Sequence, residues 1–109
     1  MNKYGNKKIE QDGMVFDSKK ELKRWQELKL LQRAGEIMEL KRQVPFRLLP
    51  SQRTPTGATV REVVYIADFT YRDKRGAFVI EDVKGFRTKD YILKKKLMLF
   101  IHGNWIKEV

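Results

Sequence analysis

Three residues in the second half of the chain have the types and spacing of a site that cleaves phosphate esters. Asp68 lies in the run YIADFTY, and Asp82 and Lys84 lie in the run VIEDVKG. Two carboxylates that face each other repel, and a divalent cation between them turns that repulsion into a binding site. Hard oxygen ligands favour Mg²⁺, with Mn²⁺ as a substitute. A lysine beside the ion would orient a water molecule or stabilise developing negative charge, so these residues indicate metal-assisted hydrolysis.

The two runs must form neighbouring strands for these side chains to meet. Residues 61–71 and 77–84 are rich in β-branched and aromatic residues, which is typical of strands. If residues 74–76 form a three-residue loop with Gly76 in the left-handed conformation, the residue numbers of each pair sum to 150. Asp68 then lies opposite Asp82, with Cβ atoms about 5 Å apart. Lys84 shares the face of Asp82 because strand side chains alternate.

Two other interpretations of the same residues stay open. A four-residue loop would place Asp68 opposite Glu81, and Lys84 would then point away from the pair. We prefer Asp82 because it keeps the lysine on the same side. Without any chemistry, Asp68 would be a turn former at a strand end, and Asp82 with Lys84 would be an exposed strand pair.

A helix from residue 19 to about residue 34 is predicted by its first turn. Ser18 to Glu21 has the form of a capping box, and Gly35 suits the position after the helix end. Four apolar residues, three apart, form one face of this helix: Leu22, Trp25, Leu28 and Leu31. Glu21 falls inside that face. It can complete the capping box, and it can also reach toward the sheet and help to hold the cation; the two roles do not exclude each other.

The remaining segments complete an α/β (α+β) domain with a mixed central sheet. Residues 43–49 are predicted to form a short strand, which Pro45 places at a sheet edge or a bulge. Residues 50–59 are predicted to form a loop and residues 104–109 a last strand. Thr88 caps a second predicted helix, residues 89–102, which ends at Gly103. We expect a basic arm over residues 1–12 and one domain over residues 13–109. His102 is interpreted as structural, and Trp25 and Trp105 as core residues.

The charge of the chain indicates a polyanionic partner. Its 109 residues carry 24 Lys and Arg against 14 Asp and Glu, a formal charge of +10, which favours nucleic acid. The chain has no cysteine, which excludes disulfides and cysteine-ligated zinc, and it has no long apolar run, so we expect a cytoplasmic protein. The residues expected to contact DNA are Lys19, Arg53, Arg87, Thr88, Lys94, Lys95 and Lys96.

Three stretches of the chain resemble a known group of nucleases. SKKELKRWQELKLLQRAGEI, YIADFTY and EDVKGFRTKDYILKKKLM are similar to small phage proteins of the PD-(D/E)XK nuclease superfamily, and through them to Holliday-junction resolvases. The resemblance covers the chain from about residue 12. The proline that names the motif is absent, since Ala67 precedes Asp68.

The resemblance implies a restriction-endonuclease-like core of helix, three strands, helix and strand. It implies Mg²⁺ held by Asp68, Asp82 and the Val83 carbonyl, with Glu21 as a ligand or water-orienting group and Lys84 as the motif lysine. It also implies a basic residue on the second helix, for which Lys94, Lys95 and Lys96 are equal candidates.

The sequence therefore predicts a Mg²⁺-dependent endodeoxyribonuclease. By the resemblance it selects branched DNA, acts as a homodimer and, if encoded by a phage, works in the host cytoplasm. The rival prediction is a catalytically silent, basic nucleic-acid-binding module of phage recombination or packaging. Such a module needs the positive surface and has no use for the carboxylate pair.

Overall fold

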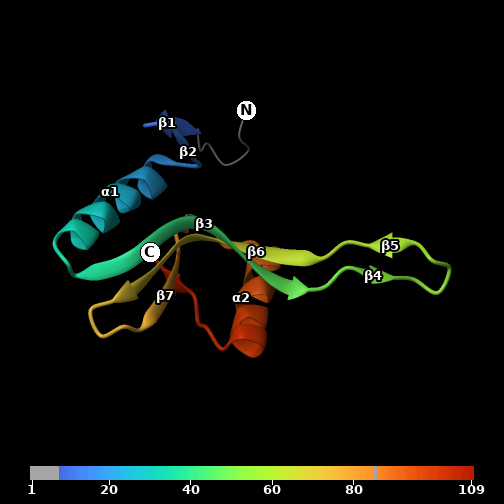
Figure 1. Ribbon diagram of the computed structural model, residues 1–109. Coiled ribbons are helices and arrows are strands. Elements are labelled where there is room, and N and C mark those ends of the chain that lie inside the picture. The colour runs from blue at the N-terminus through green and yellow to red at the C-terminus, as the bar shows by residue number, and fades with distance from the viewer. Residues whose placement is uncertain (1–7, 85) are drawn as a thin grey trace.

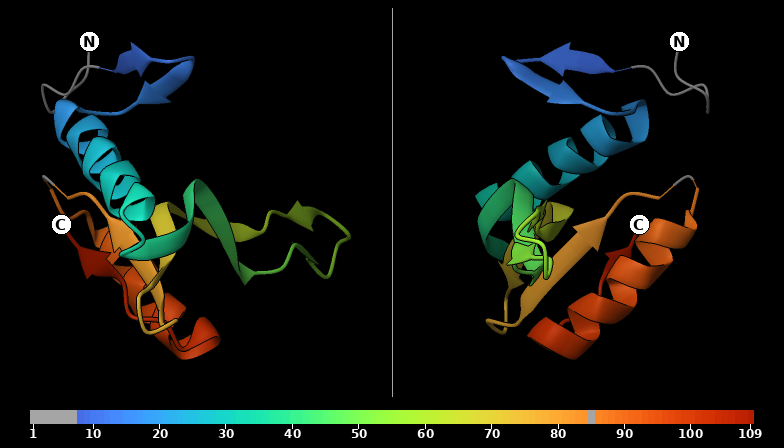
Figure 2. Two further views of the ribbon diagram at one scale, coloured as in Figure 1. Left: turned by 60° about the vertical axis from the view of Figure 1, so that its left-hand side comes forward. Right: turned by 90° about the vertical axis from the view of Figure 1, so that its right-hand side faces the viewer.

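The computed structural model describes residues 8–84 and 86–109, which form an α+β fold. Two helices lie on opposite sides of a mixed four-stranded sheet with the order β3-β6-β7-β8 (Figures 1 and 2). The pairing of β7 with β8 is parallel and the other pairings are antiparallel. The elements of this body are α1 (Lys19–Arg33), β3 (Ile37–Leu49), β6 (Val63–Asp73), β7 (Phe78–Asp82), α2 (Lys89–His102) and β8 (Lys107–Glu108).

Both helices begin at the predicted caps. Ser18 Oγ accepts a hydrogen bond from the Glu21 amide at 3.1 Å, and Thr88 Oγ1 accepts one from the Tyr91 amide at 3.0 Å. α2 ends at Gly103, whose φ of 71° is the left-handed conformation that closes a helix. Among the described residues, neither helix is long and apolar enough to cross a membrane.

The hairpin of β6 and β7 has the predicted register. Phe69 pairs with Glu81 and Thr70 with Ile80, so the residue numbers of each pair sum to 150. Gly76 has a φ of 87°, and the Asp73 amide donates to the Ala77 carbonyl at 2.9 Å across the three-residue loop. The four-residue loop is therefore wrong. One step beyond the last pair, this register sets Asp68 opposite Asp82.

Two apolar cores, one under each helix, meet at Asp68. The core under α2 includes Tyr65 and Ala67, whereas the core under α1 includes Phe69 and Tyr71. These four residues alternate along one strand and would share a face in a flat sheet. The side chains of β6 therefore face α2 before Asp68 and α1 after it. This is possible because β3 and β6 twist strongly as a pair (Figure 1).

Two hairpins project from this body. β1 (Ile9–Gln11) pairs with β2 (Met14–Phe16) beside the start of α1, so the end of the predicted basic arm is part of a hairpin. The predicted loop at 50–59 contains β4 (Gln52–Arg53) and β5 (Thr59–Val60), which extend β3 and β6 away from both helices (Figure 2). Residues 1–7 of the predicted arm, and Gly85 at the predicted strand break, lie outside the described residues.

Some boundaries and roles differ from the prediction. The edge strand begins at Ile37, six residues before the predicted start, and the last strand is confined to β8. Trp25 stacks on Phe69 with ring centroids 5.9 Å apart, as expected for a core residue. Trp105 is 59% exposed, so its assignment to the core is wrong. His102 Nε2 lies 2.9 Å from the Arg47 carbonyl, in keeping with a structural role.

Candidate functional site

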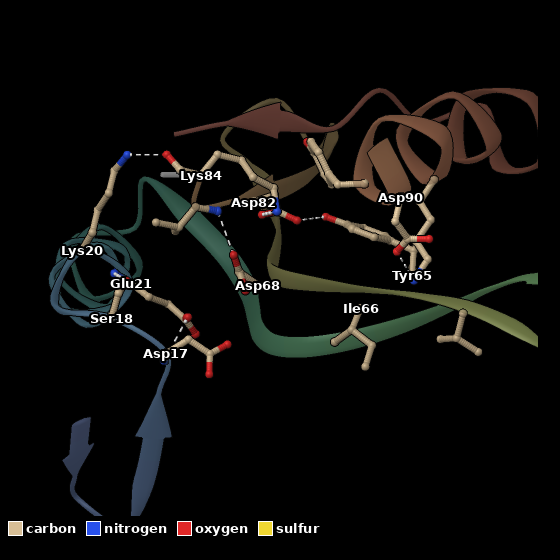
Figure 3. A pocket seen from close by; sticks show the side chains of 14 residues that line it. Asp17, Ser18, Lys20, Glu21, Tyr65, Ile66, Asp68, Asp82, Lys84 and Asp90 are labelled. Carbon is tan, nitrogen blue, oxygen red and sulfur yellow. Dashed lines mark hydrogen bonds and ion pairs between the residues drawn. The ribbon is translucent and has the colours of Figure 1, made fainter. Parts of the chain in front are cut away.

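The predicted carboxylates and lysine line one pocket of about 420 Å³ (Figure 3). It lies where the first turn of α1 faces the adjoining parts of β6, β7 and α2. Six residues singled out from the sequence line it: Glu21, Asp68, Asp82, Val83, Lys84 and Lys94. Segments that are far apart in the sequence thus bring these three carboxyl groups and two ammonium groups to one cavity, which Asp17, Asp90 and Lys20 also line.

Asp82 is buried at the end of β7 and is held on both oxygens. Its Oδ1 pairs with Lys84 Nζ at 2.7 Å, and its Oδ2 accepts a hydrogen bond from the Tyr65 hydroxyl at 2.5 Å. Burial, followed by this hydrogen bond, raises the pKa of Tyr65, so the tyrosine stays a donor. Lys84 Nζ also lies 3.9 Å from the centroid of the Tyr91 ring. The lysine is therefore fixed beside the carboxylate.

Within the described residues, Asp68 has two polar contacts, one at each carboxylate oxygen. Oδ2 accepts a hydrogen bond from the Val83 amide at 2.7 Å, and Oδ1 lies 3.5 Å from Gln43 Nε2. Burial and then the negative charge of Asp82 raise the pKa of Asp68 to about 7. The two aspartates therefore repel each other across the pocket, and the nearby lysine does not cancel that repulsion.

Glu21 is the third carboxyl group of the pocket and is 3% exposed. Its Oε2 accepts from the Asp17 amide at 3.3 Å, so the capping box is only half formed. Its Oε1 accepts from Gln43 Nε2 at 3.3 Å, and Arg42 Nη2 lies 3.6 Å away. Burial and the charge of Asp17 raise the pKa of Glu21. Gln43 thus connects Glu21 to Asp68 through one amide group.

This donor set fits one kind of cation. Within residues 8–84 and 86–109, no three carboxylate or imidazole side chains lie close enough to form a metal-binding group. An open pair of carboxylates fits Mg²⁺, which binds through one or two carboxylates and keeps several water molecules. Burial and the charge of Asp82 raise the pKa of Asp68, and a cation bound between the two carboxylates would oppose that rise. The donor chemistry therefore fits Mg²⁺ bound by Asp68 and Asp82. Glu21 is linked to Asp68 indirectly, through the side-chain amide of Gln43.

Most of the residues expected to contact DNA lie outside this pocket. Lys94 lines it and pairs with Asp90 at 3.3 Å. Arg87 and Lys95 bind Glu108 at 2.5 Å and 2.6 Å, which lowers the pKa of Glu108 to about 2, the Lys95 hydrogen bond being the main cause. These two residues therefore fasten α2 to the end of the chain.

The other expected contacts are distributed over the surface. Thr88 uses its hydroxyl as the cap of α2. Lys19 and Lys96 are exposed, on α1 and α2. Arg53 lies on β4 and donates to the Gly57 carbonyl at 3.0 Å. The structure thus brings one of the seven expected DNA contacts, Lys94, to the carboxylates.

Three contributors to the site were missed by sequence reasoning. Lys20 Nζ donates to the Lys84 carbonyl at 2.9 Å and so joins α1 to the end of β7. Tyr65 was counted as part of an apolar strand, and Gln43 as the start of another. Of these three, only Lys20 had a signal in the sequence, because it is next to Glu21 in the first turn of the predicted helix.

The carboxylate next to Asp82 has a different environment. Glu81 is fully buried on the α1 side, where Arg24 holds both its oxygens, at 2.8 Å from Nε and 2.7 Å from Nη2. The Tyr71 hydroxyl also donates to it. Glu81 therefore has the partners of a structural ion pair, and it does not line the pocket.

Comparison with known proteins gives a family and no named relative. The family described as "Protein of unknown function (DUF1064)" matches residues 1–107. No curated protein and no solved structure matches the chain.

Proposed function

The chain belongs to the DUF1064 family, and we propose that it is a Mg²⁺-dependent endodeoxyribonuclease acting at the Asp68–Asp82 pair. One observation carries the proposal: two mutually repelling carboxylates share a pocket with a lysine 2.7 Å from one of them. The restriction-endonuclease-like core is part of the same proposal. It is supported by the order helix, strands, helix and strand around these residues.

The proposed ion would be held by Asp68 and Asp82, with the Val83 carbonyl as a further ligand, and would supply a Lewis acid and an activated water. The chain's own groups have separate tasks. Lys84 presents a positive charge where the phosphorane builds up negative charge. Glu21 lines the same pocket and has a pKa raised by burial, so it would accept a proton from water. Tyr65 fixes the orientation of Asp82.

The surface charge supports a nucleic-acid substrate. A formal charge of +10 attracts a polyanion, and Lys20 and Lys94 line the pocket where a phosphate would enter. Contacts of this kind read the backbone, so the sequence preference is expected to be weak. The preference for branched DNA and the homodimer are carried by the resemblance to phage nucleases.

One observation favours the rival function, a silent nucleic-acid-binding module. The described residues contain no cluster of three metal-binding side chains, which a binding module does not need. The two functions differ in what happens to DNA after binding. The rival predicts that removing the charge of Asp82 leaves binding unchanged or tighter, with no activity to lose.

The test is cleavage of labelled four-way junction, flap and linear duplex DNA with Mg²⁺, Mn²⁺ or EDTA. Wild type is compared with Asp82→Asn and, as the matched control, Glu81→Gln, at a temperature where circular dichroism shows both variants folded. We expect metal-dependent cutting by wild type and by Glu81→Gln, and none by Asp82→Asn. Binding by all three proteins without cutting would establish the binding module. Equal cutting of every substrate would retain the nuclease and remove the junction preference.

A further inference from the structure

The segment from Leu49 to Glu62 forms a hairpin that projects from the sheet. From here on, "the arm" means this hairpin and not the basic segment predicted at residues 1–12. It continues β3 and β6 through β4 and β5 and projects away from both helices (Figures 1 and 2). Every residue of the arm is exposed except Thr54, which is half-buried. The arm belongs to neither core, so folding of the body does not explain it.

The arm is stiffened by its own hydrogen bonds. The Thr54 amide donates to the Ala58 carbonyl at 2.9 Å, and the Gly57 amide donates to the Thr54 carbonyl at 2.9 Å. Thr54 Oγ1 accepts from the Ala58 amide at 3.1 Å, and Arg53 Nη1 donates to the Gly57 carbonyl at 3.0 Å. A preformed element of this kind loses little conformational entropy on binding.

The side chains of the arm are those that bind a nucleic-acid backbone. Arg53 and Arg61 are its cations, and Glu62, at its base, is its only carboxylate. Hydroxyl donors, which bind phosphate oxygens, occupy four further positions: Ser51, Thr54, Thr56 and Thr59. An arm that docked on a second copy of the chain would carry a cluster of large apolar side chains. This one has only Leu49 and Val60.

The strand that bears Asp68 leads directly to the arm. Ile66 and Val64 line the same pocket as Asp68, and Ile66 is 53% exposed. They pair with Pro45 and Arg47 on β3. A substrate seated at the carboxylates can therefore continue along this part of the sheet until it meets the arm.

The length of this path can be expressed in base pairs. Asp68 lies seven positions after Arg61 and eleven positions after Gly57, which is at the tip of the arm. At about 3.3 Å per residue these distances are about 23 Å and about 36 Å. At about 3.4 Å per base pair they correspond to about 7 and about 11 base pairs of duplex.

We infer that the arm is a two-stranded ribbon that enters the major groove of duplex DNA on one side of the cut phosphate, about 7–11 base pairs away. The major groove is wide enough for a two-stranded β-ribbon. In this arrangement Arg53 and Arg61 would contact the phosphate backbone. The inference rests on the proposed function, because the carboxylate pair fixes the position of the cut phosphate.

The experiment varies the length of duplex on each side of the cut in the substrate that wild type cleaves best. Each flank is shortened in turn from about 14 to about 4 base pairs, which covers the reach of the arm. An armless variant has residues 50–61 replaced by Asn-Gly, and a milder variant combines Arg53→Gln with Arg61→Gln. The matched control is Arg75→Gln, an equally exposed arginine on the β6–β7 turn. Circular dichroism checks that each variant is folded.

For wild type and Arg75→Gln we expect KM to rise about tenfold when one flank falls below about 7 base pairs, with kcat unchanged. The armless variant should show the higher KM at every length, and the double variant an intermediate value. The inference is overturned if wild type cleaves long and short flanks alike, or if the armless variant keeps the length dependence. It is also overturned if removal of the arm changes only the sedimentation mass, because the arm would then bind a second copy.

If wild type cuts no substrate with Mg²⁺ or Mn²⁺, the proposed function fails and the arm is judged by hydroxyl-radical footprints on the same duplexes. A protected patch that wild type and Arg75→Gln share, and that the armless variant lacks, would support groove binding by the arm. An identical footprint for wild type and the armless variant would overturn it.

Discussion

Two neighbouring carboxylates on β7, Glu81 and Asp82, point to opposite sides of the sheet and have different environments. On the α1 side, Arg24 and Tyr71 satisfy both oxygens of Glu81. On the pocket side, Asp82 has Lys84 and Tyr65, but it also faces Asp68, whose pKa is raised to about 7. The first arrangement is complete, whereas the second leaves excess negative charge in a cavity.

The difference shows how a structural carboxylate can be told from a functional one. Arg24 and Lys84 are equally exposed, at 21% and 23%, and both contact a buried acid at 2.7 Å. Arg24 neutralises one buried carboxylate, Glu81, and also pairs with the exposed Glu27 at 3.8 Å. The Lys84 side sets three lysines against five carboxyl groups, which leaves negative charge whose cost in folding free energy a bound cation would recover. We therefore expect removal of Lys84 to lower mainly activity, and removal of Arg24 to lower mainly the free energy of unfolding.

The largest expected effect is on activity, from Lys84→Gln. We expect this variant to lose about a hundredfold to a thousandfold in kcat, because a charge that stabilises the transition state is absent. Its urea midpoint should fall less than that of Arg24→Gln, because Lys20 and Lys94 also line the pocket of Asp82. Single-turnover cleavage and urea unfolding measure the two quantities. A large loss of stability with unchanged kcat would make Lys84 a structural residue like Arg24.

The second effect is on stability, from Arg24→Gln. Glu81 would remain buried without its cation, which costs about 3 kcal/mol in the free energy of unfolding. Below its unfolding temperature the variant should cleave DNA at the wild-type rate. Urea denaturation gives the first value and a cleavage assay the second. Loss of activity without loss of stability would mean that the ion pair serves the site.

The third effect is the pH dependence of stability without metal. The folded protein raises the pKa of Asp68 to about 7, above the value of about 3.9 in an unfolded chain. The stability from this proton is fully present below about pH 4 and is lost as the pH rises through about 7. Glu21, whose pKa is also raised, acts in the same direction.

Mg²⁺ should reverse this trend, because it binds the deprotonated carboxylates. We expect Mg²⁺ to raise the unfolding temperature more at pH 8 than at pH 6 in wild type, and much less in Asp68→Asn. Differential scanning calorimetry with Mg²⁺ or EDTA measures both shifts. An equal shift at the two pH values, or an unchanged shift in Asp68→Asn, would exclude Asp68 from the metal site.

The smallest effect concerns two adjacent lysines on α1. Lys20 lines the pocket and donates to the Lys84 carbonyl, whereas Lys19 is exposed outside it. Lys20→Gln should lower kcat/KM about tenfold, because it loses a phosphate-attracting charge and a bond to the strand end. Lys19→Gln should change it less than about twofold. Steady-state kinetics on one duplex tests the pair, and equal effects would show that only overall charge matters.

Local signals were sufficient to predict the elements that carry the site. Ser18 and Thr88 are strong caps, so both helices could be placed from the sequence. The three-residue loop 74–76, which ends in Gly76, sets the hairpin register, and this register brings Asp68 opposite Asp82. These features depend on contacts only a few residues apart, which are visible in a sequence.

Long-range features were not predictable from the same patterns. The change of helix at Asp68 comes from the twist of β3 against β6, and alternation along one strand does not encode it. Tyr65 therefore looked like a core residue, although its hydroxyl reaches Asp82. The arm has the composition of a loop, and its pairing became visible only in three dimensions.

The most direct test of the carboxylate comparison is a Mn²⁺ titration followed by electron paramagnetic resonance. Wild type is compared with Asp68→Asn, Asp82→Asn and Glu81→Gln, with folding checked by circular dichroism. We predict saturable Mn²⁺ binding by wild type and by Glu81→Gln, competed by Mg²⁺, and its loss in both aspartate variants. Absence of saturable binding in wild type, or undiminished binding in the aspartate variants, would contradict a cation site at Asp68 and Asp82.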